Sequence, residues 1–231
     1  MNPKQFLASN GWLTTVPAEM RTAILDNCIQ RKFAKGEWFY RSDDLPGGIM
    51  GLASGKAMVI SDEGPNPHTP IHMFVPGQWT GVAGTLLDYN NVTGVLAKTD
   101  CVVLYLQKAV LLRILSDRPE LWRVVAEFLA LGLHTAILAH YDLLISDAPR
   151  RIAATLLRIA GCRGPMAKNV PVSIPLTQVE LCEMVNLSRT VVGAALRDFE
   201  AKGAICQSYG SIQVDPIRLS LEYENADVTL T

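Results

Sequence analysis

The residues with the clearest potential for recognition chemistry lie near the C-terminus, in residues 176–200. Thr177 is followed three positions later by Glu180, the spacing of a capping box at the start of a helix. Ser188 is a second N-cap residue, and Asn186 stands before it, where a tight turn requires the left-handed backbone that asparagine tolerates. The segment therefore predicts two capped helices joined by a turn, the helix-turn-helix layout.

The outer side of the second helix carries residues that suit a groove of double-stranded DNA. Arg189 can donate two parallel hydrogen bonds to O6 and N7 of guanine, and the small residues Gly193 and Ala194 would let the helix lie close to the groove floor. A hairpin predicted at residues 204–214 can act as a wing whose turn reaches phosphates. The alternative is a helical hairpin without a role in DNA binding. We expect the DNA contacts to come from Thr177, Gln178, Ser188, Arg189, Thr190, Gly193, Ala194, Arg197, Ser208 and Tyr209.

The distribution of charge agrees with this placement. Residues 148–220 contain nine Lys and Arg against five Asp and Glu, a net charge of +4, whereas the rest of the chain contains 12 and 17, a net charge of −5. The basic part is the one suited to the phosphate backbone. A basic excess of this size also occurs in proteins that never meet nucleic acid.

Residue types that would support an enzyme or a metal site are scattered. The sequence contains no nucleophile elbow, P-loop, H-E-x-x-H motif or paired carboxylates, so we do not expect an enzyme. Its five cysteines are widely spaced and form no C-x-x-C pair, which argues against a disulfide framework, a zinc site and an iron–sulfur cluster. They are Cys28, Cys101, Cys162, Cys182 and Cys206.

The elements that must position the C-terminal helices begin with a β-rich part. Between residues 31 and 106, short β-favouring runs alternate with turn-rich stretches. Such regular spacing of short strands predicts a small antiparallel barrel or sandwich. The runs include residues 38–40, 57–60, 71–75 and 101–106, and the turn-rich stretches are residues 43–48, 62–67, 76–77 and 88–91.

A long helix of about 27 residues is expected next, starting at Pro119. Apolar side chains occupy nearly every face of it, so one side can pack on the β-rich part while the other needs a second cover. The natural cover is the same helix of a second chain, which predicts a homodimer. The alternative is the central helix of a monomeric α/β domain.

The longest uncharged run of the same helix is residues 128–141. At 14 residues this run is too short to span a bilayer of about 30 Å. No basic N-terminal stretch leads into an apolar run with a cleavage site. We therefore expect a protein that stays in the cytoplasm and does not enter a membrane.

Taken in order, the β-rich part, the long helix and the winged helix-turn-helix resemble the family of the cyclic-AMP receptor protein and the fumarate and nitrate reduction regulator, the Crp/Fnr family. The resemblance runs from about Arg31 to Leu219. Its matching segments are AKTDC at 97–101, RIAATLL at 151–157 and LSRTVVG at 187–193, of which the last is the most specific.

This resemblance implies an α+β protein of three parts. Residues 1–118 would form a cyclic-nucleotide-binding-like β-barrel with flanking helices that senses an effector, residues 119–147 a dimerisation helix, and residues 148–231 a winged helix-turn-helix domain. It also implies a homodimer that regulates transcription, binds a pseudo-palindromic operator and contacts RNA polymerase. Effector binding in the barrel would shift the dimer helix. Thr190 and Ala194 replace a glutamate and an arginine that read bases in nucleotide-responsive members, which implies a different operator.

The sequence departs from the cyclic-nucleotide pattern where the ligand would be held. Val82 replaces the glutamate that would accept ribose hydroxyls, and Asn91 and Val92 replace the Arg-Ser pair that would grip the cyclic phosphate. A buried phosphate without its arginine would be an unpaired charge, so we do not expect ordinary cyclic-AMP binding. The residues of the expected effector pocket are Gly81, Val82, Ala83, Asn91, Val92, Ala136 and Ile137, of which the last two replace hydroxyl residues that would meet the adenine.

The sequence does not identify the effector. His68 and His72 are expected in a Pro-rich loop, where they could ligate haem or a metal. Solvent-exposed histidines without a ligand are the simpler interpretation. Cys28 and Cys101 are candidates for a redox sensor. The pocket could also suit a small apolar molecule, or be collapsed in a protein that needs none. A second functional hypothesis is therefore a small-molecule or haem-binding sensor that acts through protein contacts alone.

Overall fold

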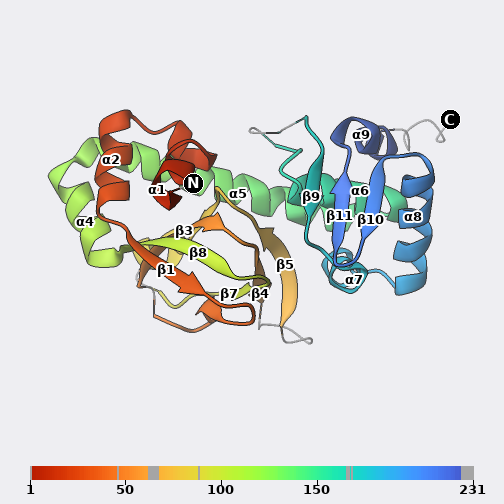
Figure 1. Ribbon diagram of the computed structural model, residues 1–231, viewed down its shortest axis with the longest axis horizontal. Coiled ribbons are helices and arrows are strands. Elements are labelled where there is room, and N and C mark those ends of the chain that lie inside the picture. Colours follow the sequence, from red (N-terminus) through yellow and green to blue (C-terminus); the bar gives the residue numbers. More distant parts are fainter. Residues whose placement is uncertain are drawn as a thin grey trace. The chain divides into compact units, whose positions relative to one another are not determined.

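The computed structural model describes residues 2–45, 47–61, 68–87, 89–164, 167 and 169–224. The predicted turn at 62–67 and the end of the predicted winged domain, 225–231, lie outside the described residues. The chain divides into two units, Met1–Ala130 and Leu131–Thr231 (Figure 1). The boundary between the units falls inside the long helix rather than at either of its ends.

Short helices open the first unit. Their order is α1 (Pro3–Ala8), the 3-10 turn η1 (Gly11–Thr14) and α2 (Ala18–Asp26). The Asn2 side chain caps α1 by accepting a hydrogen bond of 2.9 Å from the backbone N–H of Lys4. Leu7, Trp12 and Leu13 are buried, so this segment forms part of the core of the unit.

Two four-stranded antiparallel sheets follow. One has the order β1 (Ile29–Phe33), β8 (Cys101–Gln107), β3 (Gly48–Ser54), β6 (Trp79–Thr80), and the other the order β2 (Trp38–Tyr40), β7 (Gly94–Ala97), β4 (Ala57–Ser61), β5 (Thr69–Phe74). The short helix α3 (Val82–Leu87) comes between β6 and β7. Strands distant in sequence are neighbours, as β1 and β8 are in Figure 1. These two strands pair Ile29 with Tyr105.

Side chains from both sheets share one apolar core. Phe39 and Phe74 meet edge to face there, with ring centroids 6.3 Å apart. The core consists of Phe39, Met50, Leu52, Ala57, Phe74, Val95, Ala97, Cys101, Val103 and Tyr105. The β-rich prediction is confirmed, but the strands form two separate sheets rather than a closed barrel.

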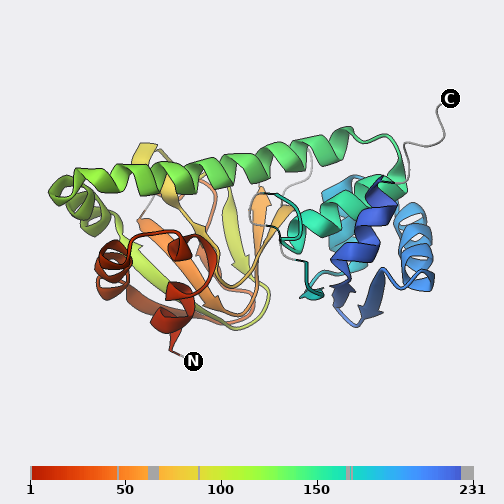
Figure 2. The same cartoon turned by 90° about the horizontal axis from the view of Figure 1, so that it is seen from above.

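The unit continues into helices, α4 (Lys108–Asp117), the 3-10 turn η2 (Pro119–Leu121) and the long helix α5 (Trp122–Leu144). Figure 2 shows α5 as one unbroken helix. By length and composition alone, Pro119–Leu144 would suffice to cross a membrane, which the short uncharged run did not predict. Core helices of soluble proteins meet the same criterion, so this finding is weak evidence for a membrane.

The second unit contains the rest of α5 and a winged domain. Its elements are α6 (Ala148–Ile159), β9 (Val172–Ile174), α7 (Gln178–Val185), α8 (Arg189–Ala201), β10 (Ile205–Ser208), β11 (Ser211–Val214) and α9 (Pro216–Glu224), with strand order β10-β11-β9. Asp147 caps α6, because its carboxylate accepts a hydrogen bond of 2.8 Å from the backbone N–H of Arg150. Helices α6, α7, α8 and α9 enclose a core that includes Ile152, Leu156, Leu181 and Phe199, each at most 1% exposed.

Candidate nucleic-acid interface

The helix-turn-helix is built by the local bonds that the sequence predicts. The backbone N–H of Glu180 donates to the Thr177 hydroxyl at 3.2 Å, and the backbone N–H of Thr177 donates to the Glu180 carboxylate at 2.8 Å. Asn186 ends α7 in the left-handed conformation, with φ 51° and ψ 52°. Ser188 starts α8 by accepting a hydrogen bond from the backbone N–H of Val191 at 3.4 Å. These two caps and the turn fix the angle between α7 and α8.

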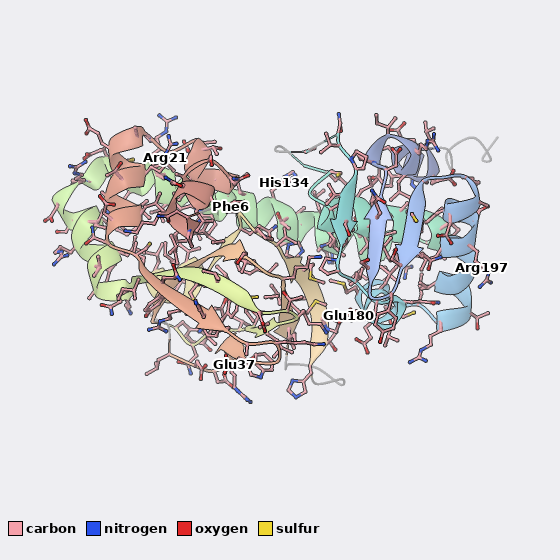
Figure 3. The ribbon with its side chains drawn as sticks, viewed as in Figure 1. Phe6, Arg21, Glu37, His134, Glu180 and Arg197 are labelled. Carbon is pink, nitrogen blue, oxygen red and sulfur yellow. The ribbon has the colours of Figure 1, made fainter. Side chains whose placement is uncertain are left out.

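Helix α8 has one buried side and one exposed side. Val192, Leu196 and Phe199 are at most 1% exposed and belong to the core of the unit. Four predicted contact residues, Arg189, Thr190, Ala194 and Arg197, lie exposed on the other side. In Figure 3, Arg197 lies on the outer side of α8. The exposed side therefore offers two guanidinium groups and a hydroxyl to a ligand.

Gly193 differs from the sequence expectation, because it is buried instead of facing the groove. A β-carbon at this position would lie 2.8 Å from Nε2 of Gln178 and 3.5 Å from Nη1 of Arg197. The Gln178 amide crosses from α7 and donates to the backbone carbonyl of Arg189 at 3.1 Å. The absence of a side chain at Gly193 thus makes room for Gln178, which supports the first turn of α8.

The wing is joined to the same helix by Glu200. Its carboxylate accepts hydrogen bonds from the backbone N–H of Gln207 at 2.8 Å and from the Gln207 side-chain amide at 3.0 Å. These bonds lower the pKa of the exposed Glu200 carboxyl. Ser208 and Tyr209 are exposed at the wing turn, as a phosphate contact would require. The role of Glu200 is not evident from the sequence, because its only local signal is an acid on an exposed helix face.

Of the predicted effector residues, five belong to the first unit and two to the second. Asn91 joins two loops of the first unit, since its side-chain amide donates to the Asp44 carbonyl at 3.1 Å and its own carbonyl accepts from the backbone N–H of Asp43 at 2.9 Å. Val92 and Ala83 are exposed. Gly81 accepts two hydrogen bonds from Thr85, at 2.7 Å from its hydroxyl and 3.1 Å from its backbone N–H. Ala136 and Ile137 are exposed on the part of α5 that belongs to the second unit.

Val82 lines a small apolar cavity of the first unit. The cavity has a volume of about 20 Å³ and also involves Trp12 of η1 and Val124 and Phe128 of α5. Ligand sites for drug-sized molecules occupy roughly 300–1,000 Å³, so this cavity is far too small for a nucleotide. Trp12 stacks on Phe128, with ring centroids 4.8 Å apart, which packs the N-terminal segment against α5.

Of the two histidines considered for haem, His68 lies in a turn, as the loop assignment expected. His72 lies in β5, as the β-favouring run 71–75 indicated and contrary to the loop assignment, and it pairs with Val59 of β4. His68 precedes that strand, and its ring centroid lies 6.1 Å from that of Trp38. Within the described residues, no group of three or more His, Cys, Asp or Glu could hold a metal ion.

The cysteines differ sharply in accessibility, which bears on the redox hypothesis. Cys28 and Cys101 are buried, as are Cys162 and Cys182, whereas Cys206 on the wing is exposed. Desolvation raises the pKa of Cys28 to about 12 and also raises the pKa of Cys101. Because the thiolate is the reactive form, neither candidate has the environment of a redox sensor.

We accordingly predict that Cys206 reacts first with iodoacetamide at pH 8. With a pKa of about 12, Cys28 would be ionised at that pH in only about one molecule in 10⁴, and burial slows it further. Mass spectrometry of the alkylated peptides over time measures the order, and denatured protein, in which all five thiols should react, is the control. Equal rates for Cys28 and Cys206 in the native protein would contradict the burial of Cys28.

Comparison with known proteins supports the division seen in the fold. Residues 150–220 match the Crp-like helix-turn-helix domain, and residues 30–118 match the cyclic nucleotide-binding domain. A CRP-like cAMP-activated global transcriptional regulator of Mycobacterium tuberculosis is 29% identical over 136 residues, which are 58% of this chain and 55% of that protein. The match thus spans about half the length of that relative.

Solved structures show the same fold over most of the chain. FixK2 from Bradyrhizobium japonicum superposes with a TM-score of 0.70 at 17% identity, covering 88% of this chain and 99% of that one. A transcriptional regulator of the CRP/FNR family from Thermus thermophilus superposes with a TM-score of 0.62 at 21% identity, covering 85% and 98%. At these identities the likeness concerns the fold alone.

Proposed function

The chain belongs to the Crp/Fnr family of transcription regulators, which are not enzymes, and we propose that it is a homodimer that regulates transcription by binding a specific DNA sequence. The operator would be a pseudo-palindrome with half-sites about one helical turn, or 34–36 Å, apart. The protein would act in the cytoplasm and contact RNA polymerase on the DNA.

The observation that carries this proposal is the exposed first turn of α8. Arg189 and Thr190 are exposed there, and Gln178 supports the backbone beneath them. The N-terminal turn of the second helix is the part that meets base edges in this motif. Arg189 and Thr190 would therefore contact bases, whereas Arg197, Ser208 and Tyr209 would contact phosphates.

An exposed apolar stripe along α5 supports the homodimer. Leu129, Leu133, Ile137 and Leu144 are 38%, 63%, 44% and 64% exposed in the single chain, and they recur at the helical spacing of one face. Trp122 extends the stripe toward the start of the helix and is 47% exposed. A second copy of α5 would cover this stripe with an identical one, as two-fold symmetry requires.

We do not extend cyclic-AMP activation, which the name of the Mycobacterium relative states, to this chain. Val82 packs in an apolar cavity, and the Asn91 amide is bonded to the Asp44 carbonyl, so neither side chain is arranged to hold a ribose or a phosphate. The protein would respond to another effector, or need none.

Replacing Arg189 by alanine tests the proposed function. Loss of a bidentate contact with guanine costs about 1–3 kcal/mol at each half-site, so Arg189→Ala should lose most of its sequence preference. The operator is first selected from random DNA with the wild-type protein, and footprinting at several salt concentrations then compares wild type and variant. Specific binding should weaken steeply as salt rises. If the wild type selects no sequence, the proposed function is wrong and a sensor acting through protein contacts takes its place.

A further inference from the structure

A buried carboxylate ends the long helix. Asp142 lies in the last turns of α5, and its side chain is 1% exposed. One carboxylate oxygen accepts a hydrogen bond of 2.7 Å from Nε of Arg158 on α6, and the other accepts from the guanidinium of Arg163. The side chains of Arg158 and Arg163 are 4% and 18% exposed. A single buried acid thus pairs with two arginines, one from α6 and one from the segment after α6.

Arg163 extends this network to the last helix of the unit. Its Nη2 donates to the hydroxyl of Tyr223 on α9 at 3.0 Å, and its guanidinium lies 4.7 Å from the centre of the Tyr223 ring. The guanidinium of Arg150 also lies over that ring, at 5.3 Å. We use the term clamp for Asp142, Arg158, Arg163 and Tyr223, which join α5, α6, the segment after α6, and α9.

The backbone of residues 161–164 places Arg163 within reach of Asp142. Gly161 and Gly164 flank it with φ angles of 67° and 106°, which L side chains rarely adopt. A β-carbon on Gly164 would lie 3.5 Å from the imidazole of His134 and 3.7 Å from Leu138, both on α5. The segment therefore packs closely along α5 while Arg163 reaches Asp142.

Charged hydrogen bonds restrict the orientation of one helix relative to another more than apolar contacts do. Apolar side chains can slide over one another at little cost, whereas a buried ion pair needs its donors and acceptor in line and strongly resists separation. A rotation of α5 against α6 would move the Asp142 oxygens away from both guanidinium groups. The clamp thus fixes the direction in which α5 leaves the winged domain.

We propose that this clamp sets the separation of half-sites that the protein accepts on DNA. The inference rests on the proposed homodimer: if α5 joins the two chains, its direction relative to each winged domain determines where the two α8 helices lie. One added base pair moves a half-site by about 3.4 Å and rotates it by roughly 34–36°. Asp142, Arg158, Arg163 and Tyr223 are then positioning residues, which act on DNA recognition without touching DNA.

Two mild variants test the proposal, Arg163→Gln and Tyr223→Phe. Each leaves Asp142 paired with Arg158, so the unit should remain folded. Wild-type protein is titrated with its selected operator and with operators whose half-sites are one base pair closer or further apart. We expect the wild type to bind the operator with one half-site separation much more tightly than the others. In each variant this ratio of affinities should fall at least about threefold. The base preference within a half-site should stay unchanged. Lys202→Gln is the matched control, since it removes one positive charge and the two ion pairs of Lys202, with Asp198 and Glu222, in the same unit.

Amide hydrogen exchange without DNA gives a second readout. Exchange at the backbone amides of residues 145–151 should be faster in both variants than in the wild type and in Lys202→Gln. Unchanged separation preference and unchanged exchange in both folded variants would overturn the proposal. A wild type that selects no operator would refute the proposed function and the half-site claim with it, while the exchange rates would still decide whether the clamp holds α5.

Discussion

Replacing Leu133 by aspartate is expected to convert the protein from a dimer to a monomer and to lower its operator affinity by a factor on the order of 10²–10⁴, the usual gain from linking two binding sites. Leu133 stands in the middle of the exposed stripe of α5 and is 63% exposed in the single chain. Symmetry would place two introduced carboxylates against each other in an apolar interface, which opposes association. Analytical ultracentrifugation measures the oligomeric state, and titration of operator DNA measures the affinity.

Glu127→Lys is the control for this prediction. Glu127 lies on another side of α5, where it pairs with Arg123 at 3.0 Å in an exposed, helical contact of small energetic value. The control should remain dimeric and bind the operator as the wild type does. A Leu133→Asp protein that stays dimeric at micromolar concentration would mean that the stripe is not the interface and that α5 does not join the two chains through it.

The helix-turn-helix could be predicted from sequence because its determinants are local. Thr177 and Glu180 lie within one helical turn, and Asn186 and Ser188 meet their hydrogen-bond partners within four residues. Such contacts depend little on the rest of the chain. The caps, the turn and the exposure of Arg189 and Thr190 therefore follow from the residues themselves.

The β-rich part was harder to predict, because its pairings are distant. Single strands could be recognised from β-favouring runs, but the pairing of β1 with β8 joins residues as far apart as Ile29 and Tyr105. No local pattern states which edge a strand will join, or whether two sheets close into a barrel. A strand at His72 could be recognised from the run 71–75, but its partner, β4, could not.

The same limit applies to the details of the site. The burial of Gly193 depends on Gln178, which lies on the preceding helix and reaches across to α8. The clamp is more distant still, because Asp142, Arg158, Arg163 and Tyr223 are separated by up to 60 residues between bonded partners. In the sequence Asp142, Arg158 and Arg163 look like ordinary surface charges, and only tertiary packing shows that they share one cluster with Tyr223.

The second large effect concerns the stability of the second unit. Asp142→Asn is expected to lower the free energy of unfolding of this unit by about 3–5 kcal/mol, the usual cost of removing one partner from a buried ion pair. The amide would remove the negative charge that pairs with both Arg158 and Arg163, in a place where their side chains are 4% and 18% exposed. Repulsion between the two guanidinium groups would add to the cost of their desolvation.

The distribution of tryptophan allows the two units to be followed separately. All four tryptophans, Trp12, Trp38, Trp79 and Trp122, belong to the first unit, so their fluorescence reports only its unfolding. Circular dichroism follows both units. In denaturant, Asp142→Asn should shift part of the dichroism transition to lower concentration and leave the tryptophan transition near the wild-type midpoint. A loss of the tryptophan signal at the same lower midpoint would show instead that the units unfold together.

Asp198→Asn is the matched control, because Asp198 forms an exposed pair with Lys202 in the same unit at 2.7 Å. Surface pairs of this kind contribute at most about 1 kcal/mol, so the control should move the transition little. Removing all three charges together, as Asp142→Leu with Arg158→Met and Arg163→Met, should restore much of the lost stability, since well-packed apolar residues often replace a buried ion cluster at no cost. That triple variant would still lack directional hydrogen bonds, so it should fold and yet accept a wider range of half-site separations. A triple variant that keeps the wild-type preference would show that apolar packing alone can hold the direction of α5.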